Sequence, residues 1–295
     1  MLKSIQLVLA LACITFNCYS QHLLEYNLKV GDTFRVNQSA IQNMKMTVDG
    51  ADHNITNTLE GTFFLEVVAK DSDHYLLNSY FEMFKFKTES DIYGIVNYID
   101  TETPLEEQDK ESKIFEGLLH VGFQIKLMKT GAIDSVTGSE AIIENMIRLS
   151  GIEDEFSVNL IRQGVQSQFS NASLAESLEQ MTYMLPAENV SMDATWENSF
   201  SGTIQASNHW KLKSYSNSNY HIVGTAIISF NSQEEDVEIG LVGTQETQAT
   251  IDSSNGFFTE IIVTQYASGT TKMNVLSKVE IPTSLQATIT YKRLL

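Results

Sequence analysis

The sequence has few cysteines, prolines, histidines and basic residues, and each shortage excludes a class of protein. Its 295 residues include 2 cysteines, 3 prolines and 6 histidines, which excludes a disulfide-stapled scaffold, a collagen-like chain and a scaffold built on Cys/His metal sites. The 19 Lys and Arg against 37 Asp and Glu give a net charge of −18, which repels nucleic-acid phosphates and anionic lipid. What remains is an acidic chain with 42% hydrophobic residues, enough for a globular core.

Long apolar runs are also missing beyond the first residues of the chain. Residues 1–20 carry a basic residue, Lys3, near their start, continue through an apolar stretch at 5–14 and end in Ser20. This pattern is typical of a secretory signal peptide cleaved before Gln21. Because no later segment reaches the roughly 18 apolar residues of a membrane-spanning helix, we expect no transmembrane segment and a periplasmic or secreted protein.

Both cysteines, Cys13 and Cys18, lie within this predicted leader. The mature chain would then contain no thiol, and burial rather than cross-linking would have to stabilise it. The alternative is a lipoprotein anchored through Cys13 or Cys18. The residues before both cysteines match a lipidation pattern poorly, so we favour export without an anchor.

Most of the remaining chain alternates polar and apolar residues, which indicates strands with one buried face. The alternation is clear at 121–128, where Val121, Phe123, Ile125 and Leu127 share one side, and at 285–292, where Leu285, Ala287, Ile289 and Tyr291 do. Turn residues such as Asp49-Gly50 separate about a dozen such strands. One-sided patterns of this kind predict an antiparallel sheet.

Residues 137–185 interrupt the alternation with three helical stretches. The sequences Thr137–Glu140 and Ser173–Glu176 have the spacing of capping boxes and predict two helix starts. Behind them, apolar residues recur at helical spacing in three groups: Ile142, Ile143, Met146 and Ile147; Phe156, Leu160, Ile161, Val165 and Phe169; and Leu174, Leu178 and Met181. We interpret the polar segments 101–112 and 232–238 as solvated loops.

These patterns predict an α+β fold dominated by β-structure. A large antiparallel sheet would curve toward a half-barrel, and a three-helix insertion would pack on it. We expect residues 21–295 to form a single β-rich domain, with the alternative of two β-lobes (21–136 and 187–295) joined by the helical segment 137–186.

Three short motifs resemble an uncharacterised family of exported bacterial β-rich proteins, a domain of unknown function. They are YNLKVGDTF at 26–34, LPAENV at 185–190 followed by Thr195 and Trp196, and TID at 250–252 followed by Asn255 and Gly256. The resemblance implies an exported β-rich protein. It implies no catalytic residues.

Motifs for catalysis or cofactor binding are missing as well. The six histidines show no helical pairing for zinc, no Gly-x-Ser-x-Gly elbow occurs, and no glycine-rich phosphate loop joins a strand to a helix. We therefore predict no catalytic residue, no metal and no cofactor. A hydrolase whose site is assembled from scattered residues is the weakest of our functional hypotheses.

Aromatic and aliphatic side chains give the positive functional signal. If the curved sheet leaves an apolar cleft on its concave face, the predicted lining residues are Phe63, Phe81, Met83, Trp196, Trp210 and Phe257. Our first hypothesis is a non-enzymatic exported envelope protein that binds an apolar molecule such as lipid there. The second is a structural or interaction protein that meets another envelope protein and holds no small ligand.

Overall fold

The computed structural model describes residues 21–104, 107, 109–233, 237–273 and 279–294. The predicted signal peptide and both cysteines lie outside these residues. The strands are β1 (Gln21–Leu24), β2 (Thr33–Val48), β3 (Ala51–Lys70), β4 (His74–Ser90), β5 (Gly94–Asp100), β6 (Phe123–Met128), β7 (Ile133–Thr137), β8 (Glu188–Ser191), β9 (Thr195–Phe200), β10 (Ile204–Ser216), β11 (Asn219–Gln233), β12 (Val237–Asp252), β13 (Phe258–Met273) and β14 (Glu280–Leu294). The helices are α1 (Lys110–Glu116), α2 (Ser139–Ser150), α3 (Glu155–Phe169) and α4 (Asn171–Thr182).

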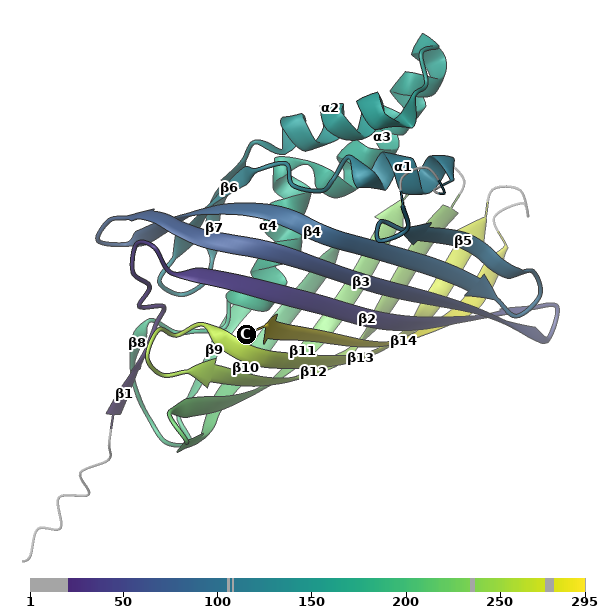
Figure 1. Ribbon diagram of the computed structural model, residues 1–295. Coiled ribbons are helices and arrows are strands. Elements are labelled where there is room, and N and C mark those ends of the chain that lie inside the picture. Colours follow the sequence, from purple (N-terminus) through teal and green to yellow (C-terminus); the bar gives the residue numbers. More distant parts are fainter. Residues whose placement is uncertain (1–20, 105–106, 108, 234–236, 274–278, 295) are drawn as a thin grey trace, which may run out of the picture.

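One large antiparallel sheet dominates the molecule, as the sequence predicts (Figure 1). Its strand order is β7-β6-β4-β3-β2-β14-β13-β12-β11-β10-β9, and β5 pairs with the outer part of β4. The sheet curls strongly but does not close into a barrel. The strands of this sheet that come first and last along the chain, β2 and β14, pair with each other at its centre. Strands β1 and β8 form a separate two-stranded sheet. The division into two lobes stays a prediction.

Alternation along each strand divides the sheet into an inner face and an outer face. In β14 the buried residues are Ile281, Thr283, Leu285, Ala287 and Tyr291, and the residues between them are more exposed. In β6 the buried residues are Phe123, Ile125 and Leu127. Because side chains of a strand point alternately to opposite faces, each pattern assigns one face to the core. The helices lie on that inner face (Figure 1).

The three helices expected within 137–185 are present, but their ends differ from the prediction. Gly138, in a left-handed conformation, caps α2 without a side-chain hydrogen bond, so the capping box at Thr137–Glu140 is wrong. Helix α4 begins earlier than expected, at Asn171. Its N-cap is Ser170, whose Oγ accepts a hydrogen bond from Ser173 N. In α3, Phe156 is 74% exposed because this end of the helix projects beyond the sheet, whereas Val165 and Phe169 are buried.

A fourth helix, α1, occupies part of the segment interpreted as a loop. Asp109 caps it, since its carboxylate accepts a hydrogen bond from Ser112 N at 2.7 Å. Phe115 of this helix stacks on Phe84 of β4 with ring centroids 4.9 Å apart. The polar composition of 101–112 concealed the helix because α1 is short and contributes few apolar side chains.

Helix α4 lies between β7 and β9, the two strands at the ends of the sheet order. On the β7 side, Ile133 N donates to the carboxylate of Glu179, and Thr182 Oγ1 donates to the Gly131 carbonyl at 2.6 Å. On the β9 side, the Asn198 side chain donates to the Tyr183 carbonyl at 2.8 Å. The helix therefore bridges the gap that the sheet leaves open.

The contact of Gly131 with α4 makes a testable prediction about stability. Gly131 has φ +90°, and an added Cβ would overlap the carbonyl of Thr182. We expect Gly131→Ala to destabilise the protein by more than about 3 kcal/mol, because it combines backbone strain with a steric clash. Urea denaturation measures this change. Gly50→Ala is the matched control, since Gly50 has φ +81° with open space around it and should lose only about 1 kcal/mol. Equal losses of stability in both variants would contradict this account of the contact between Gly131 and α4.

Candidate functional site

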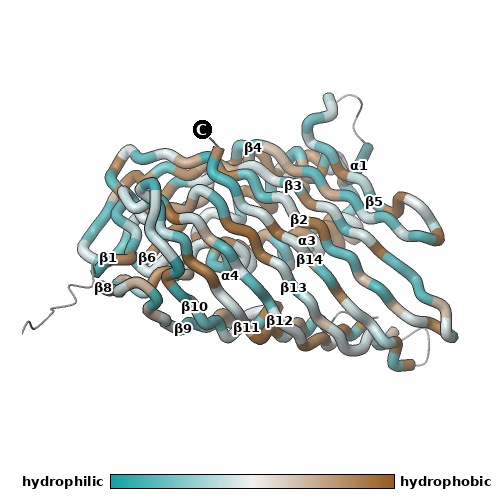
Figure 2. The backbone as a smooth tube through the Cα atoms, turned by 90° about the horizontal axis from the view of Figure 1, so that it is seen from below, coloured by the Kyte–Doolittle hydropathy of each residue, from teal (hydrophilic) through white to brown (hydrophobic). Residues whose placement is uncertain are grey.

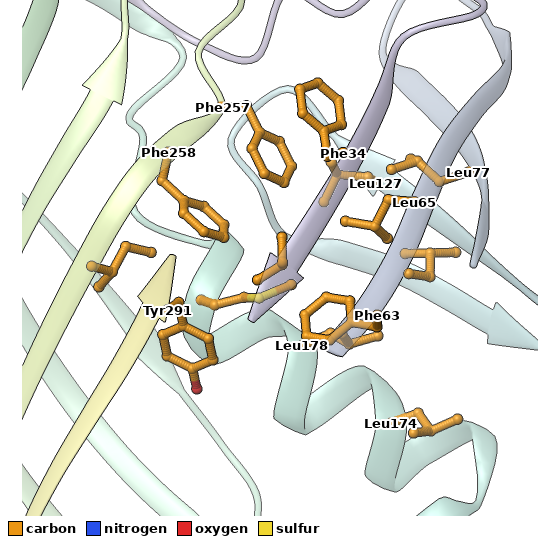
Figure 3. Close-up of a cluster of buried hydrophobic side chains, with 14 of the residues drawn as sticks. Phe34, Phe63, Leu65, Leu77, Leu127, Leu174, Leu178, Phe257, Phe258 and Tyr291 are labelled. Atoms are coloured by element: carbon orange, nitrogen blue, oxygen red, sulfur yellow. The ribbon is translucent and has the colours of Figure 1, made fainter. Parts of the chain in front are cut away.

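Four of the six residues predicted to line a cleft belong to the main hydrophobic core or pack against it, and Figure 3 shows two of them, Phe63 and Phe257. Phe63 of β3 and Phe81 of β4 have ring centroids 6.1 Å apart, and Phe81 also meets Phe169 of α3. Phe257 stacks on Phe34 of β2 with ring centroids 4.0 Å apart. Trp210 is buried in the same core on β10. These aromatic side chains fill the helix-covered half of the inner face.

The other two predicted residues have different surroundings. Trp196 of β9 is half-buried beside its cross-strand partner Trp210, and its Nε1 donates to the Met184 carbonyl at 2.9 Å. Met83 of β4 pairs with Thr62 at a bulge in the β3–β4 register. Because Phe63 and Phe81 beside this pair point inward, Met83 points to the outer face. The structure therefore brings five of the six residues onto one face and leaves Met83 on the other.

A row of polar side chains crosses the inner face at the border of this core. The register aligns Gln245 of β12 with Gln265 of β13, and Gln42 of β2 with Asn57 of β3 and Thr88 of β4. Gln265 Nε2 donates to Gln245 Oε1 at 2.7 Å, and Asn57 Nδ2 donates to Gln42 Oε1 at 3.0 Å. We call these five residues the polar belt. Each pair satisfies polar groups that would be costly to bury alone.

Beyond the polar belt the inner face becomes apolar again. A second hydrophobic cluster lies there and consists of strand residues alone: Leu241, Leu285 and Ala287, with Met44, Phe230, Ile239 and Ala267 packed around them. We call these seven residues the distal apolar surface. Met44, Phe230 and Ile239 remain half-buried rather than buried. The distal apolar surface therefore still offers apolar area to a ligand.

The helix-covered half, by contrast, has little free volume. A cavity of about 10 Å³ lies between Gln180 of α4 and the sheet, and Gln245, Gln265 and Tyr291 contribute to its wall. This volume is about that of one water molecule. A ligand larger than water does not fit this cavity.

The described residues offer little support for catalysis or metal binding. Ser216 Oγ lies 3.2 Å from Nε2 of His221, but the other ring nitrogen faces the Thr250 hydroxyl at 3.4 Å rather than a carboxylate. Within the part of the chain that the structure describes, no three His, Cys, Asp or Glu side chains gather as metal ligands. No described helix is long and apolar enough to cross a membrane.

A sequence profile for a family of unknown function, DUF6263, matches residues 72–258, which is more than half of the chain. The chain belongs to this family. The match covers β4 and the helices, and continues through β12 to the first residue of β13. It confirms the resemblance to an uncharacterised family that the sequence motifs indicated. A comparison with curated proteins found no match.

The chain aligns with one solved structure at a TM-score above 0.5 and with others at lower scores. A structure described as lipid-protein interactions in lipovitellin aligns with a TM-score of 0.53 and 7% identity, over 90% of this chain and 25% of that chain. The outer membrane channel COG4313 from Pseudomonas putida F1 aligns at 0.30 and 8% identity, over 91% and 97% of the two chains. The translocator domain of autotransporter NalP from Neisseria meningitidis aligns at 0.22 and 6% identity, over 90% of each chain. The lipovitellin likeness is one of fold, and this chain spans a quarter of that protein.

The burial of Tyr291 predicts a specific dependence of stability on high pH. Burial raises the pKa of Tyr291 from 10.0 to about 12, because the charged phenolate would lose its hydration. Between pH 10 and 12 the unfolded chain therefore loses this proton while the folded chain keeps it, and stability should fall by roughly 2–3 kcal/mol. Below pH 10 both states hold the proton and the effect is absent.

The Tyr291→Phe variant should show a shallower loss of stability over that pH range, measured as urea midpoints at several pH values. Tyr93→Phe is the control, because Tyr93 is 81% exposed and its phenol is not buried on folding. An unchanged pH slope in Tyr291→Phe would show that the phenol is hydrated in the folded state.

Proposed function

We propose that this protein is a non-enzymatic exported protein of the cell envelope that binds a lipid or similar apolar molecule on the distal apolar surface. The observation that carries the proposal is the half-buried cluster of Met44, Phe230 and Ile239 around Leu241 and Leu285, which no helix side chain joins. Apolar side chains that keep part of their area exposed on a concave face are favourable places for an apolar ligand.

Two further observations support this choice. The fold is similar to that of lipovitellin, a protein whose structure is described in terms of lipid–protein interactions. The leader-like sequence at 1–20 is suited to export, which would bring the chain to an envelope compartment. The predicted cleft residues Phe63, Trp210 and Phe257 would then stabilise the scaffold instead of contacting the ligand.

The polar belt defines which ligands fit. It separates the distal apolar surface from the helix-covered core, so an acyl chain would lie on the distal side and end at the amides of Gln245, Gln265 and Gln42. These amides carry no charge, and the half-buried Gln42 and its partner Asn57 can exchange hydrogen bonds with a polar head group. An amphipathic molecule with a neutral or zwitterionic head therefore suits this arrangement better than a fatty anion, which the net charge of −18 would repel.

Binding of a fluorescent phosphatidylcholine analogue, below its micellar concentration, to delipidated protein tests the proposal. We expect the double variant Met44→Ser/Phe230→Ser to bind at least tenfold more weakly, because each side chain supplies about 1.5–3 kcal/mol of burial. The matched control is Ile41→Ser/Ile227→Ser, which removes two exposed isoleucines from the outer face of β2 and β11. Failure of wild-type protein to bind, or an equal effect in the control, would contradict the proposed site.

A second candidate function is that of an envelope interaction protein without a small ligand, and the β4–β5 hairpin favours it. Ile92 and Tyr93 are exposed in the turn, and Ile95, Val96 and Tyr98 are exposed on β5, which pairs with β4 along one edge. A concentration of exposed apolar residues beside an unpaired strand edge is typical of a protein interface.

Native mass spectrometry of protein purified from its own envelope separates the two candidates. We expect co-purified lipid. A stoichiometric protein partner without lipid would favour the second candidate.

A further inference from the structure

The outer face of the sheet contains a groove of about 530 Å³ that the functions above do not use. It crosses five neighbouring strands, β3, β2, β14, β13 and β12, which Figure 2 shows side by side from below. Strands in a sheet are about 4.8 Å apart, so the groove is roughly 19 Å long. Its volume falls within the range of small-molecule sites.

The register shows how the walls of the groove are built. One wall is a row of cross-strand neighbours on the outer face: Val242, Ser268, Ser284 and Lys45. The other wall is the next outer row, Tyr266, Gln286 and Asn43, and Asn54 lies at the β3 end. Between the two rows lie Gly243, Ala267, Leu285 and Met44, whose side chains belong to the inner face. The floor of the groove is therefore backbone.

The polar groups of the walls are available to a ligand. Within the described residues, the side chains of Tyr266, Ser268, Ser284 and Gln286 make no hydrogen bond to another side chain or to the backbone. Tyr266 is 52% exposed, which leaves a face of its ring open at the groove. The groove thus combines an aromatic surface with the unengaged hydroxyls of Ser268 and Ser284 and the unengaged carboxamide of Gln286.

The groove has almost no net charge of its own. Lys45 is its one charged lining residue, and its Nζ lies 3.3 Å from the carboxylate of Asp52. An anionic ligand would meet a cation that is already paired, on a protein with a net charge of −18. Asn43 and Asn54 already bond to Thr56 and Asp91. A purely apolar ligand would leave the Gln286 carboxamide and the two serine hydroxyls without partners.

From this chemistry we infer that the outer groove binds a neutral oligosaccharide. A sugar ring presents an apolar C–H face that can lie on the ring of Tyr266, and hydroxyls at its rim that can both donate to and accept from carboxamides and serines. A groove that is open along its length and crosses several strands accommodates a chain of sugars rather than a single compact ligand. The inference is independent of the lipid proposal, because the side chains that would contact the sugar point to the opposite face of the sheet from the distal apolar surface.

Isothermal titration of the full mature chain with three neutral tetrasaccharides, of N-acetylglucosamine, β-linked glucose and α-linked glucose, tests this inference. We expect at least one to bind with a Kd below 1 mM, and Tyr266→Ala to weaken that binding at least tenfold. Gln286→Leu, which keeps the side-chain size but removes the carboxamide, should weaken it severalfold. Tyr215→Ala is the matched control, since Tyr215 of β10 is an exposed tyrosine outside the groove, and it should bind as the wild type does.

Several outcomes would overturn the inference. They are the absence of binding by all three sugars, equal affinity in Tyr266→Ala and Tyr215→Ala, or tighter binding of an anionic tetragalacturonate than of the neutral sugars. Circular dichroism of each variant establishes that it is folded. Phosphatidylcholine binding in Tyr266→Ala should remain at the wild-type level, so loss of sugar binding and loss of lipid binding are distinguishable.

Discussion

The rest of the structure depends on how helix α4 fills the gap between the two ends of the sheet. A curled sheet that does not close has two edge strands with unpaired backbone groups, here β7 and β9. Helix α4 satisfies groups on both sides. Its Glu179 carboxylate accepts from the Ile133 backbone of β7, and the carbonyls at its C-terminal end accept from Asn198 and Trp196 of β9. Tyr183 is the C-cap residue of α4, so its carbonyl is one that a helix leaves without an internal partner, and Met184 is the next residue of the chain. The position of α4 therefore determines which half of the inner face is covered.

The strand register determines the chemistry of the uncovered half. Because side chains alternate, Gln245, Gln265 and Gln42 lie in one transverse row only if β12, β13, β14 and β2 pair as observed. A slip of one residue between β12 and β13 would move Gln245 or Gln265 to the outer face and leave the other buried without this hydrogen bond. The polar belt thus both fixes the register and separates two apolar regions of the same concave face.

The polar and apolar periodicity of the sequence predicted the fold class, but it could not predict which distant strands pair. The alternation of Leu285, Ala287 and Tyr291 indicated both the strand and its buried face, and Leu174, Leu178 and Met181 indicated the buried face of α4. The pairing of β2 with β14, which joins the ends of the chain, has no local signal, and it creates the surface around Met44 and Leu285. The cleft prediction selected large aromatics, and Phe63, Trp210 and Phe257 are instead packed beneath the helices. The sequence did contain a signal for the polar belt. Gln42 and Gln245 are polar residues at strand positions where the alternation predicts side chains on the inner face.

Strands β12, β13, β14 and β2 contribute to both proposed sites, one on each face of a single backbone layer. In β13, Gln265 and Ala267 point inward while Tyr266 and Ser268 point outward. Close approach of the strands is part of this arrangement, because a Cβ at Gly243 would overlap the backbone of Tyr266. The inner face offers apolar area that ends at uncharged amides, and the outer face offers an aromatic ring among uncharged amides and hydroxyls. On a protein with 37 acidic and 19 basic residues, lining both surfaces with neutral groups favours uncharged ligands over anions, since any anion would approach against the field of the whole molecule.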